Sequence, residues 1–154
     1  MNNKFKTVNI MSPISGKISI LTSQKILPNS LRKIYSQKMN VIPSGNMIVS
    51  PYHGIITITN IDNIHQISIK IKKEITILIN LEINKKIPKE KISHMILYKQ
   101  YIYSNELIML NNSLIYNWIK SMIISIHYSE KIKKISLYSG VIKAGKTKIM
   151  KIKQ

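Results

Sequence analysis

Four histidines, His53, His65, His94 and His127, are the residues of this chain best suited to nucleophilic or metal chemistry. An imidazole can attack a phosphoryl group or ligate a metal ion at neutral pH. Without Cys, the chain has no thiolate zinc site, iron–sulfur cluster or cysteine nucleophile. The six acidic residues form no paired-carboxylate motif. We expect His53 in a solvated turn and His94 and His127 in loops, the last two without a second His at helix or metal-ligand spacing.

A second motif with possible chemistry is the segment Gly140-Val-Ile-Lys-Ala-Gly145-Lys146-Thr147, which is formally a Walker A sequence. In nucleotide-binding proteins this loop joins a strand of a parallel sheet to a helix, whose N-terminus holds the phosphates. The few residues that follow Thr147 leave no room for such elements. We therefore interpret the match as coincidental and expect a terminal β-hairpin over residues 140–153.

Hydrophobic periodicity predicts the elements that position these residues. Apolar side chains alternate strictly over 67–72 and again over 75–80, which is typical of a hairpin with one buried face. Further strands, punctuated by Ser, Asn, Pro or Gly, are expected within 10–20, 46–59, 101–103, 107–110, 122–126 and 140–153. Helical spacing and a capping Ser predict two short helices, Ser113–Lys120 and Ser129–Ile135. This pattern favours an all-β fold, an antiparallel β-sandwich or flattened barrel with two short helices.

The composition points to one ordinary domain and to a biased genome rather than to a nucleic-acid ligand. The chain has 154 residues and a formal net charge of +18. Almost all its basic residues are Lys, whereas base readout favours Arg, and the charge is shared evenly between the two halves. Ile, Lys and Asn, all abundant here, have A/T-rich codons. We therefore expect no sequence-specific binding to nucleic acid.

The same sequence features predict a cytoplasmic protein. The first residues, Met1–Lys6, lack the apolar run of a signal peptide, and no window approaches eighteen consecutive apolar residues. Absence of Cys suits a reducing compartment. We expect neither export nor insertion into a membrane.

Two similar turns, Ser12-Pro13-Ile14-Ser15-Gly16 and Ser50-Pro51-Tyr52-His53-Gly54, begin a resemblance to a known family. Pro43-Ser44-Gly45 precedes the second turn, Leu78–Asn84 follows it, and Gly145–Ile152 lies near the end. In order and spacing these segments resemble the glucose-type enzyme IIA component of the bacterial phosphoenolpyruvate-dependent sugar phosphotransferase system. The resemblance covers residues 8–154 as a single domain, after a short extension at 1–7.

The resemblance implies a cytoplasmic phosphocarrier without a cofactor. It would accept a phosphoryl group from the histidine phosphocarrier protein and pass it to the IIB domain of a sugar permease. The family uses two histidines fifteen positions apart, the supporting one first. His65 matches the supporting His, but the position of the phosphorylated His holds Asn80. The zinc site known in the family would keep only His65, so no metal is expected.

Asn80 leaves two interpretations open, because an amide nitrogen cannot form a stable phosphoramidate. The chain is either a degenerate phosphocarrier or a non-catalytic regulatory module that binds proteins through hydrophobic surface at 41–48 and 78–83. Whether it is an enzyme is therefore undecided by the sequence.

Further positions depart from the family pattern: Glu82 replaces a Gly, Asn84 replaces an Asp, and Tyr35–Lys38 replaces a Gly-rich loop. The positions of the two family histidines are still expected to lie close together. If 67–71 and 75–79 pair, His65 and Asn80 fall at the same end of the hairpin, and a His at position 80 would face His65.

Overall fold

A computed structural model describes residues 6–21, 24–26, 34–45, 47–61, 64–72, 75–83, 100–110, 119–129, 132 and 134–154. These residues form strands and connecting turns, with no helix among them. The strands are β1 (Thr7–Met11), β2 (Gly16–Ile20), β3 (Gln24–Ile26), β4 (Ile34–Pro43), β5 (Met47–Val49), β6 (Gly54–Ile61), β7 (Ile64–Lys72), β8 (Ile75–Ile83), β9 (Tyr101–Ile102), β10 (Leu107–Leu110), β11 (Ile119–Ser129), β12 (Lys134–Leu137), β13 (Gly140–Ile142) and β14 (Lys148–Lys153).

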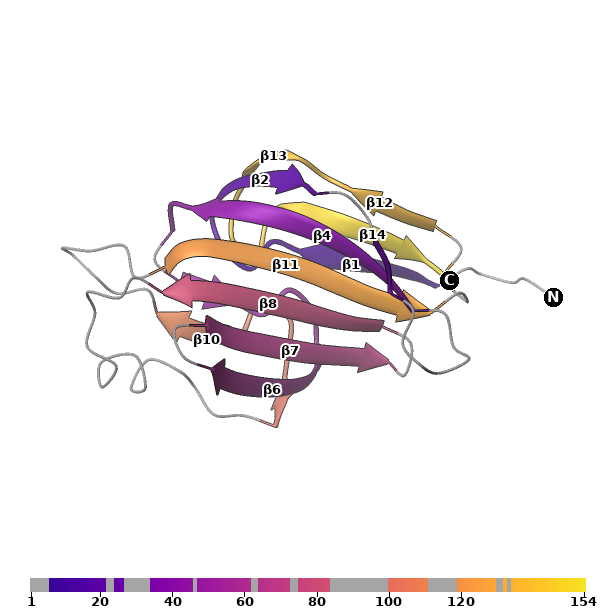
Figure 1. The fold of residues 1–154 in the computed structure, drawn as a ribbon, viewed down its shortest axis with the longest axis horizontal. Helices are drawn as coiled ribbons and strands as arrows, with labels where there is room; N and C mark the ends of the chain where they lie inside the picture. The colour runs from indigo at the N-terminus through magenta and orange to yellow at the C-terminus, as the bar shows by residue number, and fades with distance from the viewer. Residues whose placement is uncertain are drawn as a thin grey trace.

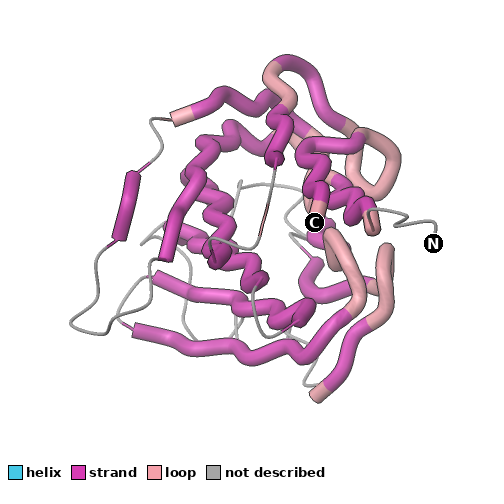
Figure 2. Tube along the Cα trace, turned by 90° about the vertical axis from the view of Figure 1, so that its right-hand side faces the viewer, coloured by secondary structure: helices cyan, strands magenta, loops and turns pink. Residues whose placement is uncertain are grey.

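The strands form an antiparallel β-sandwich, as the sequence predicts. The large sheet has the order β13-β2-β4-β11-β8-β7-β6-β9, and β3 also pairs with β4. Two smaller sheets, β1-β14-β12 and β10-β5, complete the fold. In Figure 1 the large sheet faces the viewer and β1, β14 and β10 lie behind it. Figure 2, turned by 90°, shows strands on both sides of the interior.

Alternating isoleucines build the core between the layers. Along β8, Ile75, Ile77, Ile79 and Leu81 are fully buried, whereas the residues between them are only half-buried or exposed. The β7–β8 pair confirms the predicted hairpin. β-Branched side chains pack well on such pleated surfaces, so the abundance of Ile is compatible with a well-filled core.

Neither predicted helix appears in the described residues. Ser129 ends β11, and Lys134 begins β12, so the helix predicted at Ser129–Ile135 is wrong there. Of the helix predicted at Ser113–Lys120, residues 119 and 120 belong to β11, and 113–118 lie outside the described residues. Ile119 pairs with Ile83, and Ile135 with Ile152. Pairing with partners distant in the sequence thus overrides a weak local helical spacing.

Two further expectations need correction. Tyr35–Lys38, expected in a loop, lies in the long strand β4 between β2 and β11. The terminal segment is not a hairpin: β13 pairs with β2 in the large sheet, whereas β14 pairs with β1 and β12. The turn between β13 and β14 therefore carries the chain from one layer to the other.

The two Ser-Pro turns hold each other through reciprocal backbone hydrogen bonds. Met11 N donates to Pro51 O at 3.1 Å, and Val49 N donates to Pro13 O at 2.9 Å. Inside each turn a fully buried hydroxyl donates to the carbonyl two residues on, from Ser12 at 2.5 Å and from Ser50 at 2.6 Å. We call residues 12–16 and 50–54, with the turns 103–106 and 143–147 that contact them, the turn junction.

The other two turns of the junction repeat the same pattern. Gly145 N donates to Ser12 O at 2.8 Å, and Asn105 N donates to Ser50 O at 2.9 Å. Gly145 and Asn105 both have a positive φ, of 68° and 65°. The similarity of the two Ser-Pro motifs in the sequence thus reflects equivalent places in the fold.

The Gly that ends each Ser-Pro motif is required by a close approach of backbones. A Cβ on Gly54 would lie 2.6 Å from Lys70 O, and one on Gly16 would collide with Ile42 O. Each Gly begins a strand of the large sheet, β2 or β6, directly against the neighbouring strand.

The buried hydroxyls of the turn junction predict a stability effect. Ser12→Ala or Ser50→Ala removes the hydrogen bond that a buried hydroxyl donates to a backbone carbonyl, so each should lower the free energy of unfolding by about 1–3 kcal/mol. Urea denaturation measures this. The control Ser136→Ala removes an exposed hydroxyl of β12 and should change stability by less than about 0.5 kcal/mol. Equal stabilities for Ser50→Ala and Ser136→Ala would contradict the role given to the turns.

Candidate functional site

His65 and Asn80 lie at the same end of the β7–β8 pair, as predicted, but on opposite faces of the sheet. His65 pairs with Leu81, and Gln66 pairs with Asn80. Side chains directly opposite on antiparallel strands share a face. His65, only 9% exposed, faces the core with Leu81, whereas Asn80 faces outward with Gln66. The expectation that a His at position 80 would face His65 is therefore wrong.

A bulge near the hairpin turn explains the difference. Lys72 pairs with Ile75, but Lys70 pairs with Thr76, so the register shifts by one residue between them. If the register set by the Lys72–Ile75 pair continued along both strands, positions 65 and 80 would lie on the same face of the sheet. A one-residue shift moves every following side chain to the other face. The spacing of fifteen positions in the sequence does not reveal such a shift.

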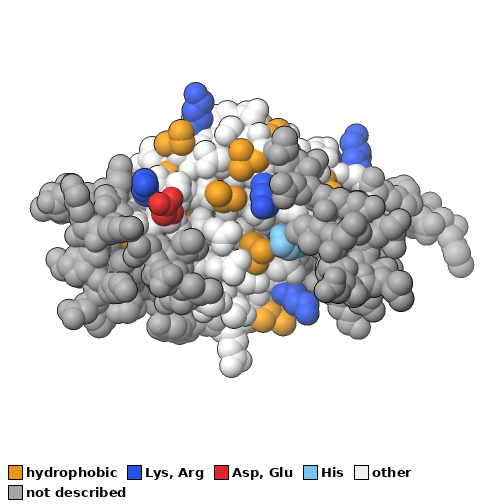
Figure 3. All heavy atoms as spheres, viewed as in Figure 1, with side chains coloured by type: hydrophobic (Ala, Val, Ile, Leu, Met, Phe, Trp, Pro, Cys, Tyr) orange, Lys and Arg blue, Asp and Glu red, His pale blue; other side chains and the backbone are white. Residues whose placement is uncertain are grey.

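The solvent-directed side of the large sheet, which we call the outer face, carries Asn80 at its centre. Ile123 of β11 lies directly opposite Asn80, and Asn40 of β4 lies opposite Ile123. Leu78 and Glu82 flank Asn80 on β8. Figure 3 looks onto this face, where apolar and charged side chains are interspersed.

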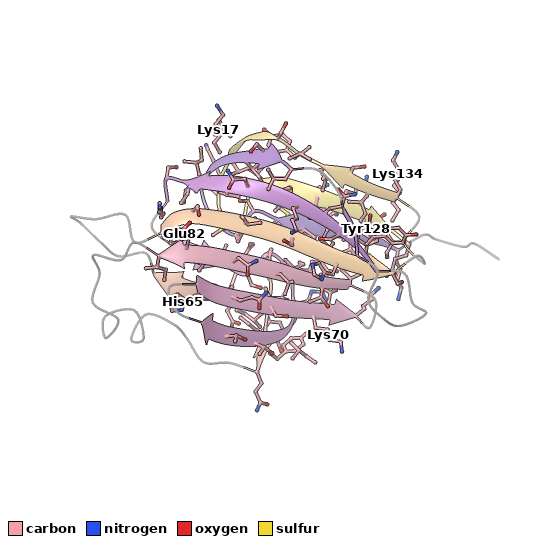
Figure 4. All side chains as sticks on the ribbon, in the orientation of Figure 1. Lys17, His65, Lys70, Glu82, Tyr128 and Lys134 are labelled. Carbon is pink, nitrogen blue, oxygen red and sulfur yellow. The ribbon has the colours of Figure 1, made fainter. Side chains whose placement is uncertain are left out.

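Glu82, at one end of the outer face, is engaged by its neighbours. Its carboxylate accepts a hydrogen bond from Ser121 Oγ at 3.0 Å and forms an ion pair of 3.4 Å with Lys120. Figure 4 shows Glu82 and His65 near the same end of the large sheet. The negative charge that this position adds is thus partly balanced by a lysine.

The hydrophobic surface expected at 41–48 and 78–83 is mostly core. Val41, Ile48 and Ile79 are fully buried between the layers. Ile42, 65% exposed, and Met47 are the exposed large apolar side chains of these segments, and Leu78 is half-buried on the outer face. Strand alternation sends every second apolar residue inward, which a list of apolar segments does not distinguish.

The remaining histidines have different environments. His53 is exposed in its turn, as predicted, and stacks on Tyr52 with ring centroids 4.1 Å apart. His94, like Asn84, lies outside the described residues. His127 is not in a loop but in β11, half-buried on the outer face. The strand expected at 122–126 continues through His127, and the alternation of Ile124-Ser125-Ile126-His127 is the signal that could have placed it.

Burial shifts the titration of two histidines. The pKa of His65 is lowered by burial. The pKa of His127 is lowered by burial and, secondarily, by the positive charge of Lys38. Among the described strands and turns, no three His, Asp or Glu side chains converge in a way that could hold a metal ion.

The Walker A-like segment is a turn of the junction rather than a phosphate loop. Lys143 O accepts hydrogen bonds from Lys146 N and Thr147 N, both at 3.1 Å, and Gly145 N is bonded to Ser12 O. Strand β14 follows instead of a helix. The amides that would cradle a phosphate are thus used within the fold, and the interpretation as a coincidental match is confirmed.

Described lysines occur on both layers, which agrees with the even spread of charge in the sequence. Lys17 and Lys70 lie on the outer face of the large sheet, and Lys134 lies on the sheet formed by β1, β14 and β12 (Figure 4). Within the described residues, no helix is long and apolar enough to cross a bilayer.

No family model matches this chain, and no curated protein matches it either. The proposal for its function therefore rests on its own residues and on the resemblance of its turn and strand motifs to those of glucose-type enzyme IIA.

The register of β7 and β8 predicts which substitutions create a metal-binding pair. Gln66→His with Asn80→His should place two imidazoles directly opposite each other on one face, able to chelate Zn²⁺ or Ni²⁺ together. Asn80→His alone should not, because His65 faces the core. Isothermal titration calorimetry should show affinity at least about tenfold higher for the double variant. Tight binding by Asn80→His that is lost with His65→Gln would contradict the register.

Burial of His65 predicts a pH-dependent stability. Its folded-state pKa lies below the ordinary value of 6.5, so the unfolded chain takes up the proton first as pH falls. Stability should therefore decrease as pH falls through about 6.5 toward the folded-state pKa. His65→Gln should flatten part of this decrease, with His127 contributing the rest. Ser136→Ala, which removes an exposed and non-titratable side chain, is the control and should leave the profile unchanged; an unchanged profile for His65→Gln would contradict the account.

Proposed function

We propose that this chain is an enzyme IIA-like component of the bacterial sugar phosphotransferase system in which partner binding, not phosphoryl transfer, is the surviving activity. The observation that carries this proposal is the placement of Asn80 on the outer face, opposite Gln66 and Ile123, while His65 faces the core. No other described imidazole lies beside Asn80. The pair that would accept and stabilise a phosphoryl group is thus missing in residue type and in geometry.

The chemistry around Asn80 supports binding to a protein. Ile123 and Leu78 provide apolar contact, and Asn40, Gln66 and Asn80 provide amide groups that both donate and accept hydrogen bonds. A patch that mixes apolar and neutral polar groups is typical of non-obligate interfaces. The partners implied are the histidine phosphocarrier protein and the IIB domain of a sugar permease, and the location is the cytoplasm.

Charge around the patch affects which partner binds well. Lys17, Lys38 and Lys70 surround the centre of the outer face, and Glu82 is paired with Lys120. A partner with an acidic rim would be steered toward this surface, whereas a basic donor protein would associate more slowly.

The first test asks whether phosphoryl transfer is lost. The chain is incubated with phosphoenolpyruvate, enzyme I and the histidine phosphocarrier protein, and mass spectrometry detects any phosphate. We expect no acid-labile phosphate on this chain, because Asn80 cannot carry it. Such phosphate, mapped to any His, would show that the protein is a working phosphocarrier.

The second test measures binding to the unphosphorylated histidine phosphocarrier protein and to an isolated glucose-type IIB domain by calorimetry. Ile123→Glu, at the centre of the patch, should weaken binding about tenfold or more by burying a charge in the interface. The matched control Ser136→Glu adds the same charge on β12 in the other layer and should change affinity less than about twofold. No binding to either partner, or equal effects of the two variants, would contradict the proposal.

A further inference from the structure

A row of polar side chains crosses the outer face at the end of the sheet opposite to Glu82. His127 of β11 lies directly opposite Ser36 of β4 on one side and Thr76 of β8 on the other. Thr76 in turn lies opposite Lys70 of β7. Figure 4 shows Lys70 and Tyr128, the neighbour of His127, at this end of the large sheet.

A second cation flanks the row. Lys38 pairs with Ser125, two residues from His127 on the same face, so its Cα lies diagonally about 7–8 Å from that of His127. Lys70 lies two strands from His127, at about 10 Å between Cα atoms. Both lysine stems are long enough to bring their ammonium groups toward His127 and Thr76.

The side chain of Ser36 is independent evidence that a hydrogen-bond acceptor is missing beside His127. Its side chain is 1% exposed, and its Oγ has no hydrogen-bond partner. A buried hydroxyl without a partner is costly, and native proteins rarely keep one without a reason. Because Ser36 shares the outer face with His127, a small ligand between these side chains would give its hydroxyl an acceptor.

We propose that Ser36, Lys38, Lys70, Thr76 and His127 form a binding site for a tetrahedral oxyanion, a phosphate ion or a phosphate monoester. Each of these side chains can donate a hydrogen bond to an anionic oxygen, and two of them carry a positive charge. On the described outer face the one carboxylate is that of Glu82, at the other end of β8 and paired with Lys120. A cation would find no charged acceptor in this group.

Two of the strands that carry the site, β4 and β11, also contact each other through side chains on the core side. On the core side of the same strands, Tyr35 and Tyr128 stack with ring centroids 5.5 Å apart, and Gln37 Nε2 donates to the Tyr128 hydroxyl at 3.4 Å. Tyr35 and Gln37 flank Ser36 on β4, and Tyr128 follows His127 on β11. These contacts therefore join the two strands on the core side, next to Ser36 and His127.

The site does not depend on the proposed function. It lies four residues along β11 from Ile123, which is opposite Asn80, and it uses neither Asn80 nor His65. An oxyanion could bind here whether or not a phosphotransferase partner exists.

The test uses the full chain and inorganic phosphate as the probe, with sodium chloride added to keep ionic strength constant. We follow the imidazole NMR signals of His127 and, as a reference, exposed His53. Phosphate should shift the His127 signals saturably, because a bound anion favours the protonated ring, and should raise the pKa of His127. Glycerol 3-phosphate, compared at the same concentrations, shows whether the free ion or a monoester binds more tightly, and either order supports the site.

Matched variants separate a site from general attraction. Ser36→Ala and Lys38→Met should each weaken phosphate binding about fivefold or more, since each removes a direct donor. Lys17→Met removes a lysine elsewhere on the outer face and should weaken it less than about twofold. Ser36→Ala should fold normally, because it removes an unpaired hydroxyl, and thermal denaturation checks this.

Three results would overturn the proposal. One is a similar shift of His53 and His127, and another is an equal response to chloride and phosphate. The third is an equal loss of affinity in Lys17→Met and Lys38→Met. Each would mean that phosphate responds to the overall positive charge and not to this group of residues.

Discussion

The reciprocal hydrogen bonds between the two Ser-Pro turns are the constraint on which the sandwich depends. Each turn takes the chain from a rear strand, β1 or β5, into the large sheet, at β2 or β6. Met11 N and Val49 N donate across to the opposite turn, so the two crossings are fixed to each other. The buried hydroxyls of Ser12 and Ser50 find backbone acceptors within their own turns. Both layers are thereby held at one point, and the isoleucine faces between them can close on a dry core.

Once the layers are fixed, strand alternation divides the chain between two chemical roles. Inward positions such as Ile77 and Ile124 are fully buried and carry the packing energy. Outward positions on the same strands hold amides, hydroxyls and lysines, which the core does not constrain. A compositional bias toward Ile and Lys can thus be accommodated, because each residue type has a face that tolerates it.

Much of the fold follows from local patterns, but the site does not. Strict alternation predicts the β7–β8 hairpin, and the repeated Ser-Pro motif predicts the turns at 12–16 and 50–54. In both cases residues that are neighbours in the sequence decide the local structure. The strand β4 and the start of β12 were missed because distant partners, β11 and β14, decide them. The face of His65 depends on a single bulge between Lys70 and Lys72, which changes no periodicity that can be read from the sequence. The pairing of His127 with Ser36, which makes His127 a candidate binding residue, depends on the register of β4 and β11 and cannot be read from the sequence.

The residues around Asn80 and those around His127 on the outer face differ in a way that links the two inferred activities. Around Asn80 the polar groups are amides, which donate and accept, and so suit the mixed hydrogen bonding of a protein surface. Around His127 they are donors, two of them cationic, and so suit an oxyanion. The step of four positions from Ile123 to His127 along β11 spans only about 13 Å. A protein seated over Asn80 would extend farther than that separation, so it would also meet the lysines of the oxyanion site.

An oxyanion bound at that site would neutralise part of the charge of these lysines and lessen their repulsion of a basic partner. An oxyanion bound around His127 would therefore affect the binding of a protein over Asn80 through electrostatics alone, with no change in the fold.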